Sequence, residues 1–248
     1  MKKPLLLLLS VLPLYLLVAQ SKHSFEYTLP ATGVKQNELT LEVPAGKLTL
    51  NSGTTSLVTT RIDYSLPEWK PKVTTSKNGE VSTLNIKQEN FKNKSGKLEN
   101  NWDVSINKNV PLSLHIALGA GDATIDLRNS SLRKLQMETG AGSCNVNLQG
   151  SKAEQIEINT GVGELDLDLS GNWNHNLAVE INGGIGSMNV KVPKGTGVSV
   201  QTSVLGSKSL NGFKKSGGVH KNSAYGKTKN TITIQISGGL GSIDVTEV

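Results

Sequence analysis

The chain has 248 residues and a formal net charge of +6, and only 4% of its residues are aromatic while 26 are glycine. Its single cysteine, Cys144, excludes an intrachain disulfide, so apolar burial and backbone hydrogen bonds must supply the stability. With so few aromatic rings, the core has to be built from small aliphatic side chains packed in thin layers.

Residues 1–20 have the layout of a cleaved secretory signal peptide. Lys2 and Lys3 precede an apolar run from Leu5 to Ala19, and at about 15 residues this run is shorter than the roughly 20 that span a bilayer. No cysteine stands directly after this run, so the chain lacks the residue that is acylated in a bacterial lipoprotein. We expect an extracytoplasmic protein (periplasmic, cell-surface or secreted) with no integral membrane span after cleavage; an uncleaved anchor is the alternative.

Residues 21–110 predict an irregular N-terminal β region. The stretch ELTLEVPAGKLTL at 38–50 alternates apolar and polar residues around Gly46, and further strand-like stretches follow at 56–64, 70–86 and 101–116. Asn78-Gly79 is a hairpin signal. The polar, Lys/Asn-rich residues 87–100 predict a loop. This region is expected to form one continuous domain with the part that follows.

Residues 111–248 contain a repeat. LGAGDATIDL at 118–127 returns as TGAGSCNVNL at 139–148, and Gly121, Gly142 and Gly163 stand 21 residues apart. Apolar residues occupy every second place before and after each of these glycines, which is the pattern of a strand with one wet face. Each repeat therefore predicts two short strands that meet at a glycine, where a residue without Cβ adopts a positive φ at little cost.

The repeat predicts an all-β fold, a parallel β-helix-like solenoid of two-strand coils with glycine corners. One coil cannot bury its own apolar side, but copies stacked about 4.8 Å apart share a core. An antiparallel β-sandwich is the alternative, because it also gives short alternating strands. No helix is expected. The structural corner glycines are then Gly46, Gly121, Gly142, Gly163, Gly186, Gly206 and Gly241.

The order of these segments resembles a known family. LTLEVPAGKLTL, NWDVSINKNVPLSLHIALGAGDATIDL, METGAGSCNVNL and ISGGLGSIDV follow one another as in the bacterial toast-rack domain proteins of unknown function, extracytoplasmic β-repeat modules related to cell-wall-stress regulators and adhesin-like proteins. The resemblance covers Glu38 to Val248. It implies an envelope location and a β-solenoid, and it brings no established catalytic residues. Unlike the stress-regulator members, this chain shows no multi-helix membrane anchor.

Outward carboxylates offer an alternative function, that of a carbohydrate-active enzyme. If each repeat forms one rung of the stack, Asp126 lies two rungs from Asp168, and Asp122 lies two rungs from Glu164. Each pair is then roughly 9–10 Å apart, near the distance between the two catalytic carboxyl groups of an inverting glycosidase. A solvated sheet face explains the same residues more simply, because nothing in the sequence buries or perturbs them. We therefore predict no enzyme and no catalytic residue.

The sequence has no pattern for a metal or a cofactor, and we predict neither. GGIGSMNV and GGLGSIDV are similar to a calcium-binding nonapeptide, but Met188 and Ile243 stand where that motif has Asp. The four histidines are far apart, with no ligand spacing, and His115 takes an outward place. Cys144 takes an inward position without a basic neighbour, so we expect an unreactive thiol.

Charge is distributed unevenly along the chain. Residues 117–180 hold nine acidic and four basic residues, whereas residues 181–243 hold eight lysines and no acidic residue. Six lysines from the insertion at 206–230 are the predicted binding segment: Lys208, Lys214, Lys215, Lys221, Lys227 and Lys229. Such a segment favours an anionic envelope polymer or protein, or a second copy bound end to end, through salt-screened forces. A merely solvated loop is the alternative.

These observations predict a non-enzymatic, envelope-associated structural or interaction module with an adhesin-like role. Nucleic acid is not an expected partner, because the protein is exported and the basic segment lacks interleaved aromatic residues for stacking. The alternatives are the carbohydrate-active enzyme and an envelope-stress sensing module, which would need a membrane partner.

Overall fold

The structure is a computed structural model that describes residues 22–89 and 98–248. The expected signal peptide and the middle of the expected loop at 87–100 lie outside these residues. The described chain is all β, with one 3-10 turn, η1 (Pro67–Trp69). The strands are β1 (His23–Leu29), β2 (Gln36–Asn51), β3 (Val58–Tyr64), β4 (Lys72–Asn78), β5 (Val81–Lys87), β6 (Asn100–Ile106), β7 (Leu112–Asp126), β8 (Leu132–Asn147), β9 (Gln155–Asp168), β10 (Leu177–Val192), β11 (Gly197–Asn211), β12 (Lys214–Ser216), β13 (Val219–Lys221) and β14 (Thr231–Glu247).

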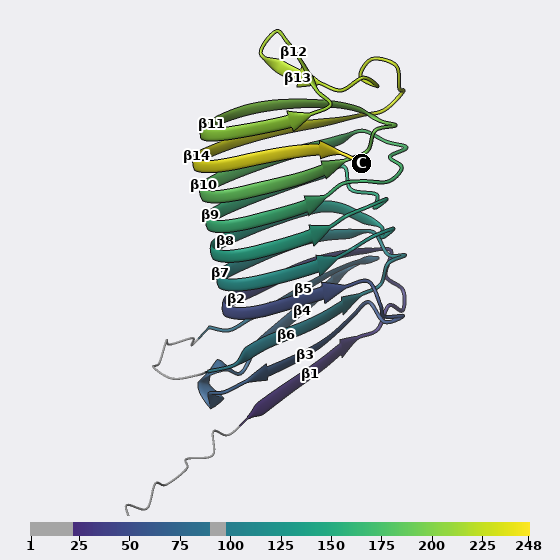
Figure 1. The fold of residues 1–248 in the computed structure, drawn as a ribbon. Helices are drawn as coiled ribbons and strands as arrows, with labels where there is room; N and C mark the ends of the chain where they lie inside the picture. The colour runs from purple at the N-terminus through teal and green to yellow at the C-terminus, as the bar shows by residue number, and fades with distance from the viewer. Residues whose placement is uncertain (1–21, 90–97) are drawn as a thin grey trace, which may run out of the picture.

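Seven long strands form a parallel stack, in the order β2, β7, β8, β9, β10, β14 and β11. Each strand folds back on itself, so that its two arms face each other across a thin core (Figure 1). The parallel solenoid is confirmed, and the stack is not the antiparallel sandwich. The two strands expected in each repeat are the two arms of one continuous bent strand.

Strict register turns the sequence repeat into columns of buried side chains. One column runs from rung to rung through the stack and is at most 1% exposed: Leu41, Ile116, Met137, Ile158, Ile181 and Ile236. Burying one aliphatic side chain contributes about 1.5–3 kcal/mol. Because each rung covers the next, no rung could keep this core dry alone.

The last two rungs of the stack do not follow chain order. β14 lies between β10 and β11, so Gly186 is followed in space by Gly241 and only then by Gly206. The residues at the inward register positions explain the exchange. β14 supplies Ile236 and Ile243, which fill the interior, whereas β11 has Thr202 and Lys208 at the paired positions and is suited only to the end of the stack.

The N-terminal region extends the other end of the stack. β2 joins it beside β7, with Gly46 in register with Gly121. In each bent strand the first arm precedes the corner glycine and the second arm follows it. Beyond β2, the strands β6, β3 and β1 continue the sheet of the second arms, while β5 and β4 continue the sheet of the first arms. The expected hairpin joins β4 to β5, but Asn78 pairs with Val81, so the turn is Gly79-Glu80, with Gly79 at φ 59°.

Candidate functional site

The seven corner glycines lie at the bends of the seven stacked strands, with φ between 128° and 159°. The corners stack so closely that they leave no room for a side chain. A Cβ atom on Gly142 would lie 1.8 Å from the carbonyl oxygen of Gly121. Glycine at this position is therefore required both by the backbone angle and by the contact with the neighbouring rung.

The six lysines of the predicted binding segment gather at the β11 end of the stack, which we call the basic end (residues 208–229). Lys208 lies on β11, Lys214 and Lys215 on β12, Lys221 on β13, and Lys227 and Lys229 in the link to β14. All are exposed except Lys221, which is half-buried. Among the described residues, none of the six forms an ion pair. The charges of the five exposed lysines are therefore available to a partner.

Asn222 fastens the basic end to the stack. The residue is 5% exposed. Its amide nitrogen donates to the carbonyl oxygen of Thr196 at 2.8 Å and to Glu247 Oε1 at 3.0 Å, and its Oδ1 accepts from the backbone N–H of Val198 at 2.9 Å. Nearby, Lys221 Nζ lies 4.5 Å from the centroid of the Tyr225 ring. The segment thus contains an aromatic contact that the sequence reasoning had overlooked.

The outward carboxylates occupy the second arms, in the predicted columns. Asp126 is in register with Asn147, which is in register with Asp168. Arg128 binds the carboxylate of Asp126 through Nε and Nη2, and this hydrogen bonding lowers the pKa of Asp126. Asp168 accepts a hydrogen bond from the backbone N–H of Ser170 at 2.8 Å. A glycosidase acid needs a raised pKa, which is the opposite of what Asp126 has.

We expect the Asp126→Asn/Asp168→Asn double variant to fold and to lose no more than about 1 kcal/mol of unfolding free energy at neutral pH, because exposed ion pairs contribute little. A lowered folded-state pKa stabilises the protein above the ordinary carboxyl range. The loss should therefore vanish as the pH falls through the folded-state pKa of Asp126. Urea unfolding at several pH values measures it. If the wild-type protein cleaved a polysaccharide and the variant did not, the enzyme alternative would be correct.

Cys144 lies in the core, in register with Ala123 and Leu165. Burial raises the pKa of its thiol, which favours the protonated form over the reactive thiolate. Within residues 22–89 and 98–248, no group of three His, Cys, Asp or Glu side chains is placed to hold a metal ion.

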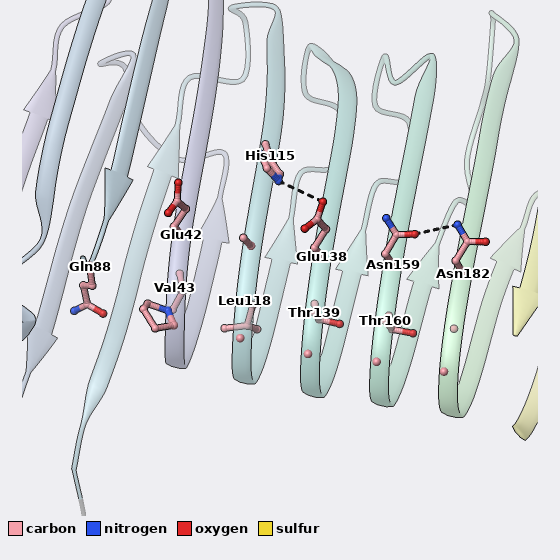
Figure 2. Close-up of a pocket in the computed structure, with 17 residues that line it drawn as sticks. Glu42, Val43, Gln88, His115, Leu118, Glu138, Thr139, Asn159, Thr160 and Asn182 are labelled. Carbon is pink, nitrogen blue, oxygen red and sulfur yellow. Dashed lines mark hydrogen bonds and ion pairs between the residues drawn. The ribbon is translucent and has the colours of Figure 1, made fainter. Parts of the chain in front are cut away.

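A groove of about 800 Å³ crosses the outer face of the first arms of β2, β7, β8, β9 and β10, next to the corners. Its floor is a row of glycines that lie two residues before the corner glycines. These positions require glycine, because a Cβ on Gly140 would lie 2.3 Å from the carbonyl oxygen of Gly119 on the neighbouring strand. Glu42, Glu138, Asn159 and Asn182 line it from successive strands, with Ala117 between the two glutamates (Figure 2). The bare backbone is what makes the surface hollow here.

Two pairs of polar side chains in the groove approach each other across neighbouring strands. Asn182 Nδ2 donates to Asn159 Oδ1 at 2.9 Å, and His115 Nε2 lies 3.9 Å from Glu138 Oε1 (Figure 2). This ladder offers hydrogen bonds and carboxylates to an extended ligand. Sequence reasoning missed the groove, although the first glycine of each G-x-G marked its floor. His115 is outward, as expected, and its side chain is 40% exposed.

The bent parallel strands, the shared aliphatic core and the polar outer faces define a rack-like β-solenoid whose surfaces, rather than an enclosed pocket, are open to partners. The sequence family described as the N-terminal domain of toast_rack, DUF2154, matches residues 18–159 and 152–191. The chain belongs to this family. The basic end lies beyond the matched residues. No curated protein matches the chain.

Comparison with solved structures finds one that shares the fold over the whole of its length. A "putative cell adhesion protein" from Clostridium sporogenes is 27% identical, with 92% of this chain and 100% of that chain covered and a TM-score of 0.69. A "putative adhesin" from Bacteroides fragilis is 11% identical, with coverage of 92% and 98% and a TM-score of 0.32. In the part of this chain that the structure describes, no helix has the length and apolar character to cross a membrane.

Proposed function

We propose that the protein is a non-enzymatic, extracytoplasmic interaction module of the bacterial envelope, with an adhesin-like role, and that its basic end binds an anionic envelope polymer. The proposal rests on the six lysines at one end of the stack, none of which pairs with a carboxylate in the described part of the chain. Residues 181–243, which include all six, hold no acidic residue. Clustered, unneutralised charge attracts a polyanion over several ångströms.

Two further observations support this partner. Lys208 and Thr202 replace aliphatic residues at the inward positions of the end strand, so a second copy stacked on β11 would have to cover a lysine. A polymer in solution can bind Lys208 without burying its charge in an apolar core. The Clostridium sporogenes structure, which carries the name of a cell adhesion protein, supports a role in contact with other molecules.

Replacing Lys214 and Lys215 with glutamine should weaken binding to poly(glycerol phosphate), a soluble polyanion, by about tenfold at low salt. The two lysines are exposed neighbours on β12, and their loss removes charge without touching the core. Titration calorimetry at low and high salt measures the effect, which should shrink as the screening length falls to about 3 Å at 1 M salt.

The matched control is Lys70→Gln/Lys152→Gln, which removes two exposed lysines outside the basic end. It should leave the affinity close to that of the wild type. Equal weakening by the two pairs, or no binding of the polyanion by the wild-type protein, would refute the assignment of the basic end.

A further inference from the structure

Four exposed aliphatic side chains form a ladder along the corners at the C-terminal end of the stack. Each directly precedes a corner glycine, and their register pairs them from rung to rung. We call them the corner ridge: Val162, Ile185, Leu240 and Leu205, which are 54%, 57%, 61% and 70% exposed. In the rungs nearer the N-terminus the same position holds alanine: Ala45, Ala120 and Ala141.

Single exposed leucines are common, but an in-register series is not, because it makes one continuous apolar strip. Rungs about 4.8 Å apart bring neighbouring side chains of the ridge into contact range. Ile185 and Leu240 each stand between two glycines, and Ser187 and Ser242 follow, so little flanking side chain covers them. The strip protrudes from the narrow edge of the stack.

Positive charge meets the corner ridge at its last rung. Lys208 lies on β11 three residues after Leu205, and it forms no ion pair with another described residue. The lysines of β12 and β13 lie farther from the corners, because Lys221 pairs with Ser199, six residues before Leu205, and at the first rung of the ridge Glu164 follows Val162 by two residues. An aliphatic strip that ends beside an unneutralised lysine complements a bilayer with anionic headgroups, where apolar insertion and electrostatic attraction add.

A second copy of the chain fits this edge poorly. A stable protein interface buries about 800 Å² on each partner, and four partly covered aliphatic side chains on a protruding edge offer much less. A fluid bilayer needs no complementary shape, since lipid chains adapt around isolated aliphatic tips. The ridge therefore suits a lipid surface better than a flat protein surface.

We propose that the corner ridge docks the protein edge-on to a bilayer that contains anionic phospholipid, with the aliphatic tips in the headgroup boundary and Lys208, at the β11 end of the ridge, over the charged surface. This goes beyond the proposed function, because it assigns a different surface, the corners, and a different ligand, a lipid bilayer rather than a soluble polymer.

Vesicle co-sedimentation of the exported protein tests the proposal. The wild type should bind vesicles of equal parts phosphatidylcholine and phosphatidylglycerol, and bind vesicles of phosphatidylcholine alone much more weakly. Leu205→Ser/Leu240→Ser should lower the partition coefficient by about tenfold or more. Val248→Ser removes an aliphatic side chain that is 51% exposed and lies off the ridge, and it should bind like the wild type.

A tryptophan reporter tests the position of the ridge independently of the extent of binding. Leu240→Trp should be quenched by brominated phospholipid in bound vesicles, whereas Thr124→Trp, on the outer face of a second arm, should not. The native tryptophans Trp69, Trp102 and Trp173 are at most 5% exposed and give a constant background. Failure of quenching at position 240, or equal vesicle binding by the leucine double variant, would overturn the proposal.

Two other outcomes are decisive. If the wild type were a dimer without lipid and Leu205→Ser/Leu240→Ser made it a monomer, the ridge would be a protein interface and the proposal would be wrong. The leucine double variant should keep its affinity for soluble poly(glycerol phosphate), which Lys214→Gln/Lys215→Gln should weaken. Vesicle binding therefore tests the corner ridge and polyanion binding tests the basic end, so that either proposal can fail without the other.

Discussion

Replacing Gly142 with alanine is expected to lower the free energy of unfolding by about 4 kcal/mol or more, a large fraction of the 5–15 kcal/mol of a typical domain. Two costs combine in this variant. The φ of 141° is one that residues with a side chain rarely adopt, and the new Cβ atom would lie 1.8 Å from the carbonyl oxygen of Gly121. That oxygen belongs to the backbone, so only a displacement of one rung against the next relieves the contact.

Gly79→Ala separates these two costs. Gly79 also has a positive φ, 59°, but nothing lies within 4 Å of a Cβ atom built there. This variant should lose only about 1–2 kcal/mol, the cost of a left-handed backbone for a residue with a side chain. Urea unfolding of both variants, with unchanged m-values, measures the difference. Equal losses would mean that close stacking of the corners does not constrain the fold.

The main architecture could be predicted because it depends on local periodicity. Alternation around Gly121, Gly142 and Gly163 fixes which residues face inward, and equal spacing brings the same residue types into register. The alternation predicts an inward position for Cys144, and in the structure it is buried between Ala123 and Leu165 of the neighbouring rungs.

The features that escaped prediction depend on contacts between segments far apart in the chain. Chain order predicts that Gly206 follows Gly186 in the stack, but β14 lies between their strands. The long insertion before β14 allows this exchange, and Lys208 at an inward position of β11 explains why β11 stands at the end. The groove and the corner ridge arise from the same cause. Alternation marks Gly140 and Val162 as members of strands, but the hollow and the ridge exist only once several rungs stand side by side.

Ile181 and Ile185 lie four residues apart on β10 and provide the second test with a large expected effect. Ile181 is fully buried in the column between Ile158 and Ile236, whereas Ile185 is 57% exposed on the corner ridge. Ile181→Ala should cost about 2–5 kcal/mol, because three carbons are lost from a site that neighbouring rungs close on both sides. Ile185→Ala should change the stability by no more than about 0.5 kcal/mol.

The difference between these two variants measures what the shared core contributes, because the chemical change, the strand and the chain are the same. Ile181→Val provides an intermediate step and should cost about 0.5–1.5 kcal/mol. Thermal and urea unfolding of the three variants give the series. If Ile181→Ala were as mild as Ile185→Ala, the rungs would not depend on one another for burial, and the stack would be held by its backbone hydrogen bonds alone.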